Sequence, residues 1–114
     1  MADKPKGDPN GEIVDALYAV IETRRGGDPD SSYTAQLLAR GTGKIAEKVG
    51  EEAIEAIVAS LSEGPDALAA ESADLIYHLC VLWADAGVRP ADVWAKLAAR
   101  QGMSGLDEKA TRKG

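Results

Sequence analysis

Apolar residues recur at helical spacing in five successive segments of the chain. Glycine, proline and serine residues separate these segments and provide start and stop signals for helices. No alternation of apolar and polar residues that would indicate a strand appears. We therefore predict an all-α helical bundle of about five helices. Four of them cover about residues 12–25, 44–62, 66–86 and 90–100, and a short second helix, capped by Ser31 or Ser32, ends at residue 40.

Both ends of the chain differ from this pattern. Residues 1–11 and 103–114 are polar and rich in Gly, Lys and Asp, and such ends seldom bury enough apolar surface to become ordered. We expect a disordered N-terminus over residues 1–11, one all-α domain over residues 12–102 and a flexible tail over residues 103–114.

Composition narrows the classes of function. The 114 residues include 19 acidic and 13 basic ones, which gives a net charge of −6 and disfavours nucleic acid as a partner. No apolar run approaches the roughly 20 residues of a membrane span, so no membrane association is expected. The single cysteine excludes an internal disulfide framework and favours a cytoplasmic location.

Two pairs of carboxylates stand out. Glu52 and Glu55 lie three apart in the third predicted helix, and Glu71 and Asp74 lie three apart in the fourth, so each pair shares one helix face. If the two helices form an antiparallel hairpin about residues 63–64, positions whose numbers sum to about 126 lie at the same height. Glu55 with Glu71 and Glu52 with Asp74 both meet this condition. We predict a central antiparallel hairpin in which the two pairs converge.

The fourth predicted helix is apolar on nearly every side. Its polar residues form a single stripe, which consists of Glu71, Asp74, His78 and Asp85. Because a helix that is apolar on most sides is central in a bundle, this stripe is unlike an ordinary solvated face. One isolated pair of acids most often belongs to a solvated helix face, but two pairs at matched height favour a functional site formed by the four carboxylates.

Four carboxylates gathered inside a small bundle repel one another and resist desolvation. A hard divalent cation relieves both effects, and oxygen ligands suit Mg²⁺, with Mn²⁺ as a substitute, better than Zn²⁺. A carboxylate-held Mg²⁺ with open coordination positions points to phosphate chemistry. The cofactor expected from the residues is therefore Mg²⁺.

Candidate substrate-binding residues flank the acids. Arg40, Lys44 and Lys48 cluster at the entrance to the third helix and are candidates to bind phosphate, the alternative being ordinary surface charges. Tyr33 is near this basic cluster and is a candidate for the substrate pocket. His78 follows Asp74 by one turn, where it either orients Asp74, touches substrate or is a hydrogen-bonded interior histidine.

Four segments of the sequence resemble one enzyme family. They are residues 17–21 (LYAVI), 32–38 (SYTAQLL), 44–55 (KIAEKVGEEAIE) and 71–79 (ESADLIYHL). In order and over about residues 13–100, the chain resembles the phosphoribosyl-ATP pyrophosphohydrolases of histidine biosynthesis. The VGEEA run together with ESADLxYH is specific to that family, whereas ExxE and ExxD alone mark the wider MazG-type all-α nucleotide pyrophosphohydrolases.

This resemblance implies Mg²⁺-dependent hydrolysis of 1-(5-phosphoribosyl)-ATP at its α–β phosphoanhydride, the second step of L-histidine biosynthesis. The products are 1-(5-phosphoribosyl)-AMP and pyrophosphate. The metal ligands carried over are Glu52, Glu55, Glu71 and Asp74, and Glu51 is carried over as a further ligand or as a base that orients water. The catalytic residues expected on this basis are Glu51, Glu52 and Glu55. Bifunctional members carry a cyclohydrolase domain, so this chain is expected to need a separate cyclohydrolase.

A homodimer is expected on two grounds. The resemblance implies it, and a fourth helix that is apolar nearly all round needs more neighbours than about ninety residues in five helices provide. Two alternatives to the biosynthetic enzyme remain open on the sequence: a MazG-like house-cleaning (d)NTP pyrophosphohydrolase, and a non-enzymatic helical module that only dimerises.

Overall fold

A computed structural model describes residues 9–101, and this part of the chain contains five helices and no strand. The all-α prediction is therefore confirmed for the described residues. Residues 1–8 and the predicted tail over residues 103–114 lie outside them. The helices are α1 (Glu12–Thr23), α2 (Tyr33–Arg40), α3 (Thr42–Ser62), α4 (Pro65–Ala86) and α5 (Pro90–Ala99).

Several helix ends follow from local sequence signals. The Ser32 hydroxyl accepts a hydrogen bond from the Ala35 backbone N–H at 3.0 Å and so caps α2. Pro65 is the first residue of α4, where its missing N–H costs nothing. Gly87 ends α4 in the left-handed conformation, with φ of 78°, which glycine adopts without steric strain. These three signals were visible in the sequence.

Two boundaries differ from the sequence-based expectation. A single residue, Gly41, separates α2 from α3. Its φ of 94°, which glycine adopts easily, changes the direction of the chain, so the next two residues can already be helical. As a result α3 begins at Thr42 and includes Gly43. Helix α1 ends two residues early because the N–H groups of Arg24 and Arg25 bond to carbonyls three residues back.

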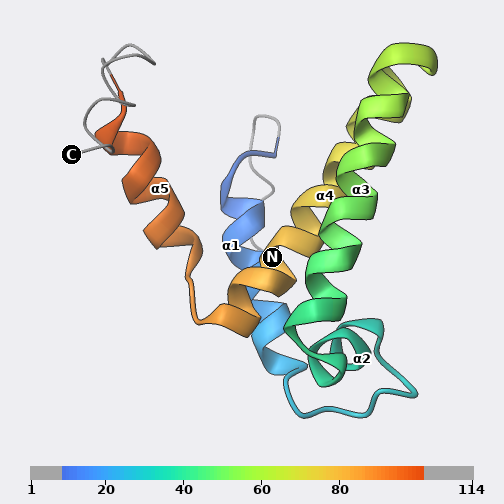
Figure 1. Cartoon of the computed structure of the whole chain (residues 1–114). Helices are drawn as coiled ribbons and strands as arrows, with labels where there is room; N and C mark the ends of the chain where they lie inside the picture. The colour runs from blue at the N-terminus through green and yellow to red at the C-terminus, as the bar shows by residue number, and fades with distance from the viewer. Residues whose placement is uncertain (1–8, 102–114) are drawn as a thin grey trace, which may run out of the picture.

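Helices α3 and α4 form the antiparallel hairpin and lie side by side along their length (Figure 1). At the open end of the hairpin, the Thr42 hydroxyl on α3 donates a hydrogen bond to the Asp85 carboxylate on α4. These two residues lie at the height that a turn at residues 63–64 requires. The predicted central hairpin and its register are confirmed.

The core lies at the open end of this hairpin, where α1, α2, the start of α3 and the second half of α4 meet (Figure 1). Cys80 is fully buried there, and burial raises the pKa of its thiol to about 11. It is therefore a small buried hydrophobe with little thiolate at neutral pH. The buried apolar residues of the cluster are Ile21, Leu37, Ile45, Cys80, Val81 and Ala84.

Hydrogen bonds fix α1 against the end of α4 and the link to α5. The Tyr18 hydroxyl donates to the Val88 carbonyl at 2.8 Å. The Arg25 guanidinium donates to the Ala84 carbonyl at 2.7 Å, where a cation also suits the negative end of the helix dipole. Helix α5 then runs away from the hairpin on the far side of α1 (Figure 1).

The outward face of α3 is apolar although it is exposed. Ile54, Ile57, Val58 and Leu61 follow helical spacing along this face, and their exposed fractions are between 47% and 81%. A solvated helix face is normally polar. We refer to these four residues, 54, 57, 58 and 61, as the α3 apolar stripe.

Helix α4 is the one described helix that is long and apolar enough to cross a membrane, with a mean hydropathy of 1.2 over 18 residues. It nevertheless carries Glu71 and Asp74 and packs against both α3 and α1. The core helix of a soluble bundle meets the same criteria, so this property alone is weak evidence for a membrane span.

Candidate metal and substrate site

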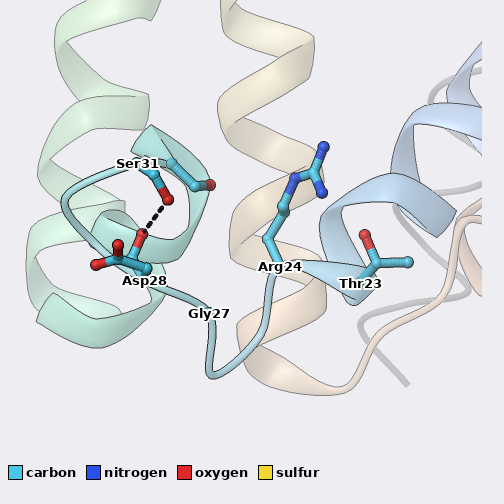
Figure 2. A pocket seen from close by; sticks show the side chains of 6 residues that line it. Thr23, Arg24, Gly27, Asp28 and Ser31 are labelled. Atoms are coloured by element: carbon cyan, nitrogen blue, oxygen red, sulfur yellow. Dashed lines mark hydrogen bonds between the residues drawn. The ribbon is translucent and has the colours of Figure 1, made fainter.

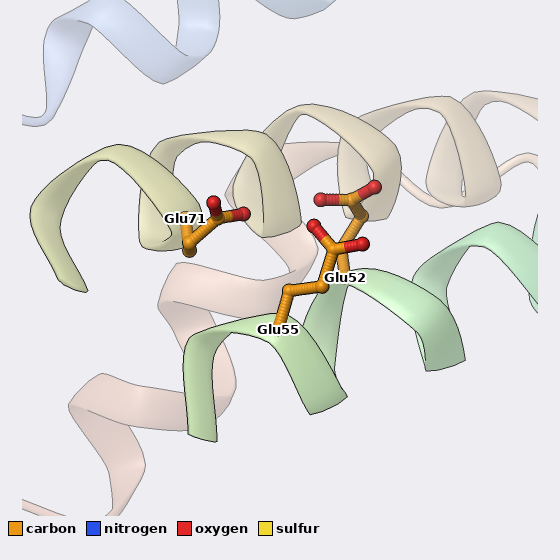
Figure 3. Close-up of side chains that lie close together, drawn as sticks. All are labelled: Glu52, Glu55 and Glu71. Atoms are coloured by element: carbon orange, nitrogen blue, oxygen red, sulfur yellow. The ribbon is translucent and has the colours of Figure 1, made fainter. Parts of the chain in front are cut away.

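Three carboxylates meet between the two long helices. Glu52 and Glu55 extend from α3 and Glu71 extends from α4, and the three side chains point toward one another (Figure 3). Each contributes an oxygen to a group in which all the atoms lie within 4.8 Å of one another. The predicted convergence of acids across the hairpin is thus present for these three residues.

Part of this acid cluster (Glu52, Glu55 and Glu71) is withdrawn from water. The Oε1 atoms of Glu52 and Glu71 are buried and have no hydrogen-bond partner among the described residues. Buried polar atoms are nearly always paired. Two buried carboxylate oxygens without a donor, in a cluster of acids, are therefore suited to hold a cation.

The pKa of Glu71 is raised above its usual value. Its burial is the main cause, followed by a hydrogen bond between its protonated form and Glu55 and by the negative charges of Glu55, Asp74 and Glu52. All of these effects favour the neutral carboxyl. A cation at the cluster would act in the opposite direction and favour the ionised form.

Asp74 and Glu51 lie at the margin of the cluster. Asp74 is exposed and is outside the group of three, although its charge is near enough to raise the pKa of Glu71. Glu51 is exposed and accepts a hydrogen bond from Lys48 at 3.0 Å. This contact lowers the pKa of Glu51, so its carboxylate is kept ionised.

The predicted basic residues follow the first half of α3. Besides the pair of Lys48 with Glu51, Lys44 approaches Glu47 at 3.6 Å. Arg40, at the end of α2, is exposed and makes no ion pair within residues 9–101. The pKa of Lys48 is raised by its hydrogen bond to Glu51 and then by the nearby Tyr33 and Glu51. Lys48 therefore remains a cation and is paired with Glu51.

Tyr33 and His78, 45 residues apart in sequence, contact each other. The Tyr33 hydroxyl lies 3.2 Å from His78 Nε2, and His78 Nδ1 lies 2.8 Å from the backbone carbonyl oxygen of Asp74. His78 is buried, so of the roles considered from sequence the hydrogen-bonded interior histidine describes its surroundings. The sequence contained no signal for this contact, because nothing local relates positions 33 and 78.

A pocket of about 490 Å³ lies elsewhere, at the connection between α1 and α2 (Figure 2). It holds none of the predicted site residues, and its single hydrogen bond drawn in Figure 2 joins Ser31 to the Asp28 carbonyl. The acid cluster has the unpartnered buried oxygens that this pocket lacks, and it is the candidate site. The pocket is lined by Thr23, Arg24, Gly27, Asp28, Ser31 and Ser32.

Comparison with known proteins identifies relatives over most of the chain. A family model described as phosphoribosyl-ATP pyrophosphohydrolase matches residues 14–101, a range that includes every predicted site residue. A phosphoribosyl-ATP pyrophosphatase of Paramagnetospirillum magneticum is 64% identical over 101 residues, or 89% of this chain and 93% of that protein. One of Rhodospirillum rubrum, with the same name, is 62% identical over 92% of this chain and 90% of its own length.

Proposed function

The chain belongs to the phosphoribosyl-ATP pyrophosphohydrolase family, and from this membership we infer the reaction that it catalyses. It is a hydrolase of histidine biosynthesis that converts phosphoribosyl-ATP to phosphoribosyl-AMP and pyrophosphate by cleaving a phosphoanhydride. The observation in the fold that supports this function is the acid cluster between α3 and α4. We propose that the reaction takes place in the cytoplasm.

We propose that Glu52, Glu55 and Glu71 hold Mg²⁺, with Asp74 as the fourth ligand. The two buried oxygens without donors support this assignment, as does the all-oxygen donor set. A divalent cation held by these residues would neutralise phosphate charge and polarise the phosphoanhydride. Mn²⁺ binds the same kind of oxygen ligands and is proposed as a substitute for Mg²⁺.

The remaining roles belong to side chains around the cluster. Arg40, Lys44 and Lys48 are proposed to bind phosphate oxygens, with Lys48 adjacent to the acids. Glu51, which Lys48 keeps ionised, is the proposed acceptor of a proton from the attacking water. To free the Glu51 carboxylate for this role, the Lys48 side chain would turn from Glu51 toward the phosphate groups of the substrate. Tyr33, which is half-exposed beside Lys48, is proposed to contact the substrate.

The substrate preference separates this function from the alternative of a MazG-like (d)NTP pyrophosphohydrolase. We expect kcat/KM for phosphoribosyl-ATP to exceed that for each dNTP by more than about a hundredfold, because a site built to bind a substrate's polar groups rejects analogues that lack them. Pyrophosphate release measured on phosphoribosyl-ATP and a dNTP panel tests this. A preference for any dNTP would favour the alternative, and no release from any substrate would favour the non-enzymatic module.

Mg²⁺ is expected to raise the Tm of the protein, because a ligand bound only by the native state stabilises it, by about 2.7 kcal/mol at one hundred times Kd. Since the pKa of Glu71 is raised, protons compete with the cation, and the Tm increase should shrink as the pH falls through that pKa. Thermal melts with Mg²⁺, Mn²⁺ or K⁺ between pH 4.5 and 8 measure this. An equal shift with K⁺, or no shift with either divalent ion, would contradict the metal assignment.

We propose that the protein is a homodimer. Three observations support it: the exposed α3 apolar stripe, the limited core at one end of the hairpin, and a Cα radius of gyration of 16.5 Å. A compact domain of about 100 residues has a radius of gyration of about 13 Å. A second copy packed on the stripe would bury apolar surface that the single chain leaves in water.

A further inference from the structure

The ring of His78 makes one hydrogen bond through each of its nitrogens. A backbone carbonyl oxygen only accepts hydrogen bonds, so Nδ1, at 2.8 Å from the Asp74 carbonyl, must carry the proton. In the neutral ring Nε2 is then the acceptor, and the Tyr33 hydroxyl donates to it at 3.2 Å. The geometry thus specifies the Nδ1–H tautomer and the direction of both bonds.

These bonds leave His78 without a polar atom for substrate. The residue is 6% exposed, and its ring packs edge-on against Tyr77, with the ring centroids 4.9 Å apart. Tyr33 differs, because 48% of its surface is exposed while its hydroxyl is held by His78. Of the two aromatic residues, only Tyr33 can present a ring face to a ligand.

Tyr33 is placed near the reacting groups by this link. It is the first residue of α2, and its hydroxyl reaches α4 through His78 at the turn that contains Asp74. The Tyr77 ring stacks on the Tyr33 ring, with the two centroids 6.3 Å apart and the planes 24° from parallel. The ring is therefore supported by two residues of α4, one of which is hydrogen-bonded to the backbone of Asp74.

We propose that His78 is a positioning residue that does not touch substrate. Held as the Nδ1–H tautomer by the Asp74 carbonyl, it fixes the Tyr33 ring as the aromatic surface against which the nucleoside part of the substrate packs. Aromatic rings stack on nucleobases, which gives such a surface a direct role in binding. The role in substrate binding rests on the function proposed above, whereas the tautomer does not.

The tautomer is testable without substrate because His78 is the single histidine of the chain. A long-range ¹H–¹⁵N correlation spectrum of ¹⁵N-labelled protein at pH 8 should show one ring with a protonated Nδ1 and an unprotonated Nε2. A protonated Nε2, in either the other neutral tautomer or the imidazolium, would overturn the proposal. This result stands independently of any activity measurement.

The positioning role predicts a specific kinetic pattern with phosphoribosyl-ATP and Mg²⁺. Tyr33→Phe keeps the ring but loses the hydrogen bond, and KM should rise about two- to tenfold with kcat nearly unchanged. His78→Leu should have the same effect, and the double variant should be no worse than either single one. His78→Gln retains an acceptor for the Tyr33 hydroxyl and should restore KM. The matched control is Tyr18→Phe, which loses a hydroxyl bonded to the Val88 carbonyl, away from Tyr33 and His78, and should leave KM unchanged.

Other outcomes of this series overturn the proposal. Additive effects of Tyr33→Phe and His78→Leu on KM would show that the two residues act separately. A loss of kcat at constant KM in His78→Leu would indicate contact with the reacting atoms. If no variant and no wild-type preparation hydrolyses phosphoribosyl-ATP, the proposed function fails while the spectrum still decides the tautomer.

Discussion

Replacing Glu71 with glutamine is expected to stabilise the metal-free protein and to inactivate the enzyme. The pKa of Glu71 is raised, chiefly by burial and then by Glu55 and its other acidic neighbours, so its ionised form opposes folding. The neutral Glu71 carboxyl contributes fully to the stability of the native state at a pH below the ordinary pKa of glutamate. This contribution is lost as the pH rises through the raised pKa of Glu71. Glutamine is neutral at every pH, so the Tm gain of Glu71→Gln should appear at pH 7.5 and vanish at low pH.

The same substitution removes a proposed metal ligand. Substitution of a residue that only orients a metal ligand already lowers metal affinity or activity by about 10–100-fold. Loss of a ligand itself should therefore lower Mg²⁺-dependent pyrophosphate release by more than about a hundredfold. The shift of Tm on adding Mg²⁺ should fall with it. Activity assays and thermal melts at pH 4.5 and 7.5 measure both effects on one preparation.

Glu63→Gln is the matched control for this experiment. Glu63 is an exposed glutamate at the turn between α3 and α4, and its loss removes the same charge without touching the cluster. It should leave the activity and the response to Mg²⁺ unchanged. Wild-type activity in Glu71→Gln, or a lower metal-free Tm at pH 7.5, would refute the proposed role of the acid cluster.

The protein is expected to sediment at twice the 11.9 kDa mass of the chain, and Ile57→Asp is expected to convert it to a monomer. Ile57 is 56% exposed in the centre of the α3 apolar stripe. An aspartate there would place an unpaired carboxylate in an apolar interface, which costs several kcal/mol. Association should weaken by more than about a hundredfold, measured by analytical ultracentrifugation across micromolar concentrations.

Gln36→Asp is a suitable control, because Gln36 is an exposed residue of α2 away from the α3 apolar stripe. This variant should remain dimeric. Wild-type protein that sediments as a monomer, or a dimer that persists in Ile57→Asp, would show that the stripe is not the interface. Either result leaves the assignment of the acid cluster to be decided by its own experiment.

Much of the fold followed from periodicity. Each helix could be placed because its apolar residues repeat at helical spacing, and the register of the hairpin followed from the single turn at residues 63–64. The convergence of Glu52, Glu55 and Glu71 was predictable for the same reason, since residue height along two antiparallel helices is simple arithmetic.

The features that could not be predicted from the sequence depend on contacts between distant residues or on one torsion angle. Gly41-Thr42-Gly43 indicated a break, but the sequence did not show that the φ of Gly41 alone would make it. The bond of Tyr33 to His78 required knowing where α2 sits on α4. Asp74 matched the spacing rule and yet lies at the margin of the cluster, because equal height does not determine side-chain direction.

The position of the core has a consequence for cooperativity within the chain. Buried side chains gather at the open end of the hairpin, whereas the turn end, around residues 61–68, has little packed against it in the single chain. Stability is distributed unevenly in such a structure, and local opening costs least where few apolar contacts hold an element. Glu55 and Glu71 lie between these two regions, so a cation that joins them would hold α3 and α4 together at the boundary of the packed core and would limit local opening to the turn end.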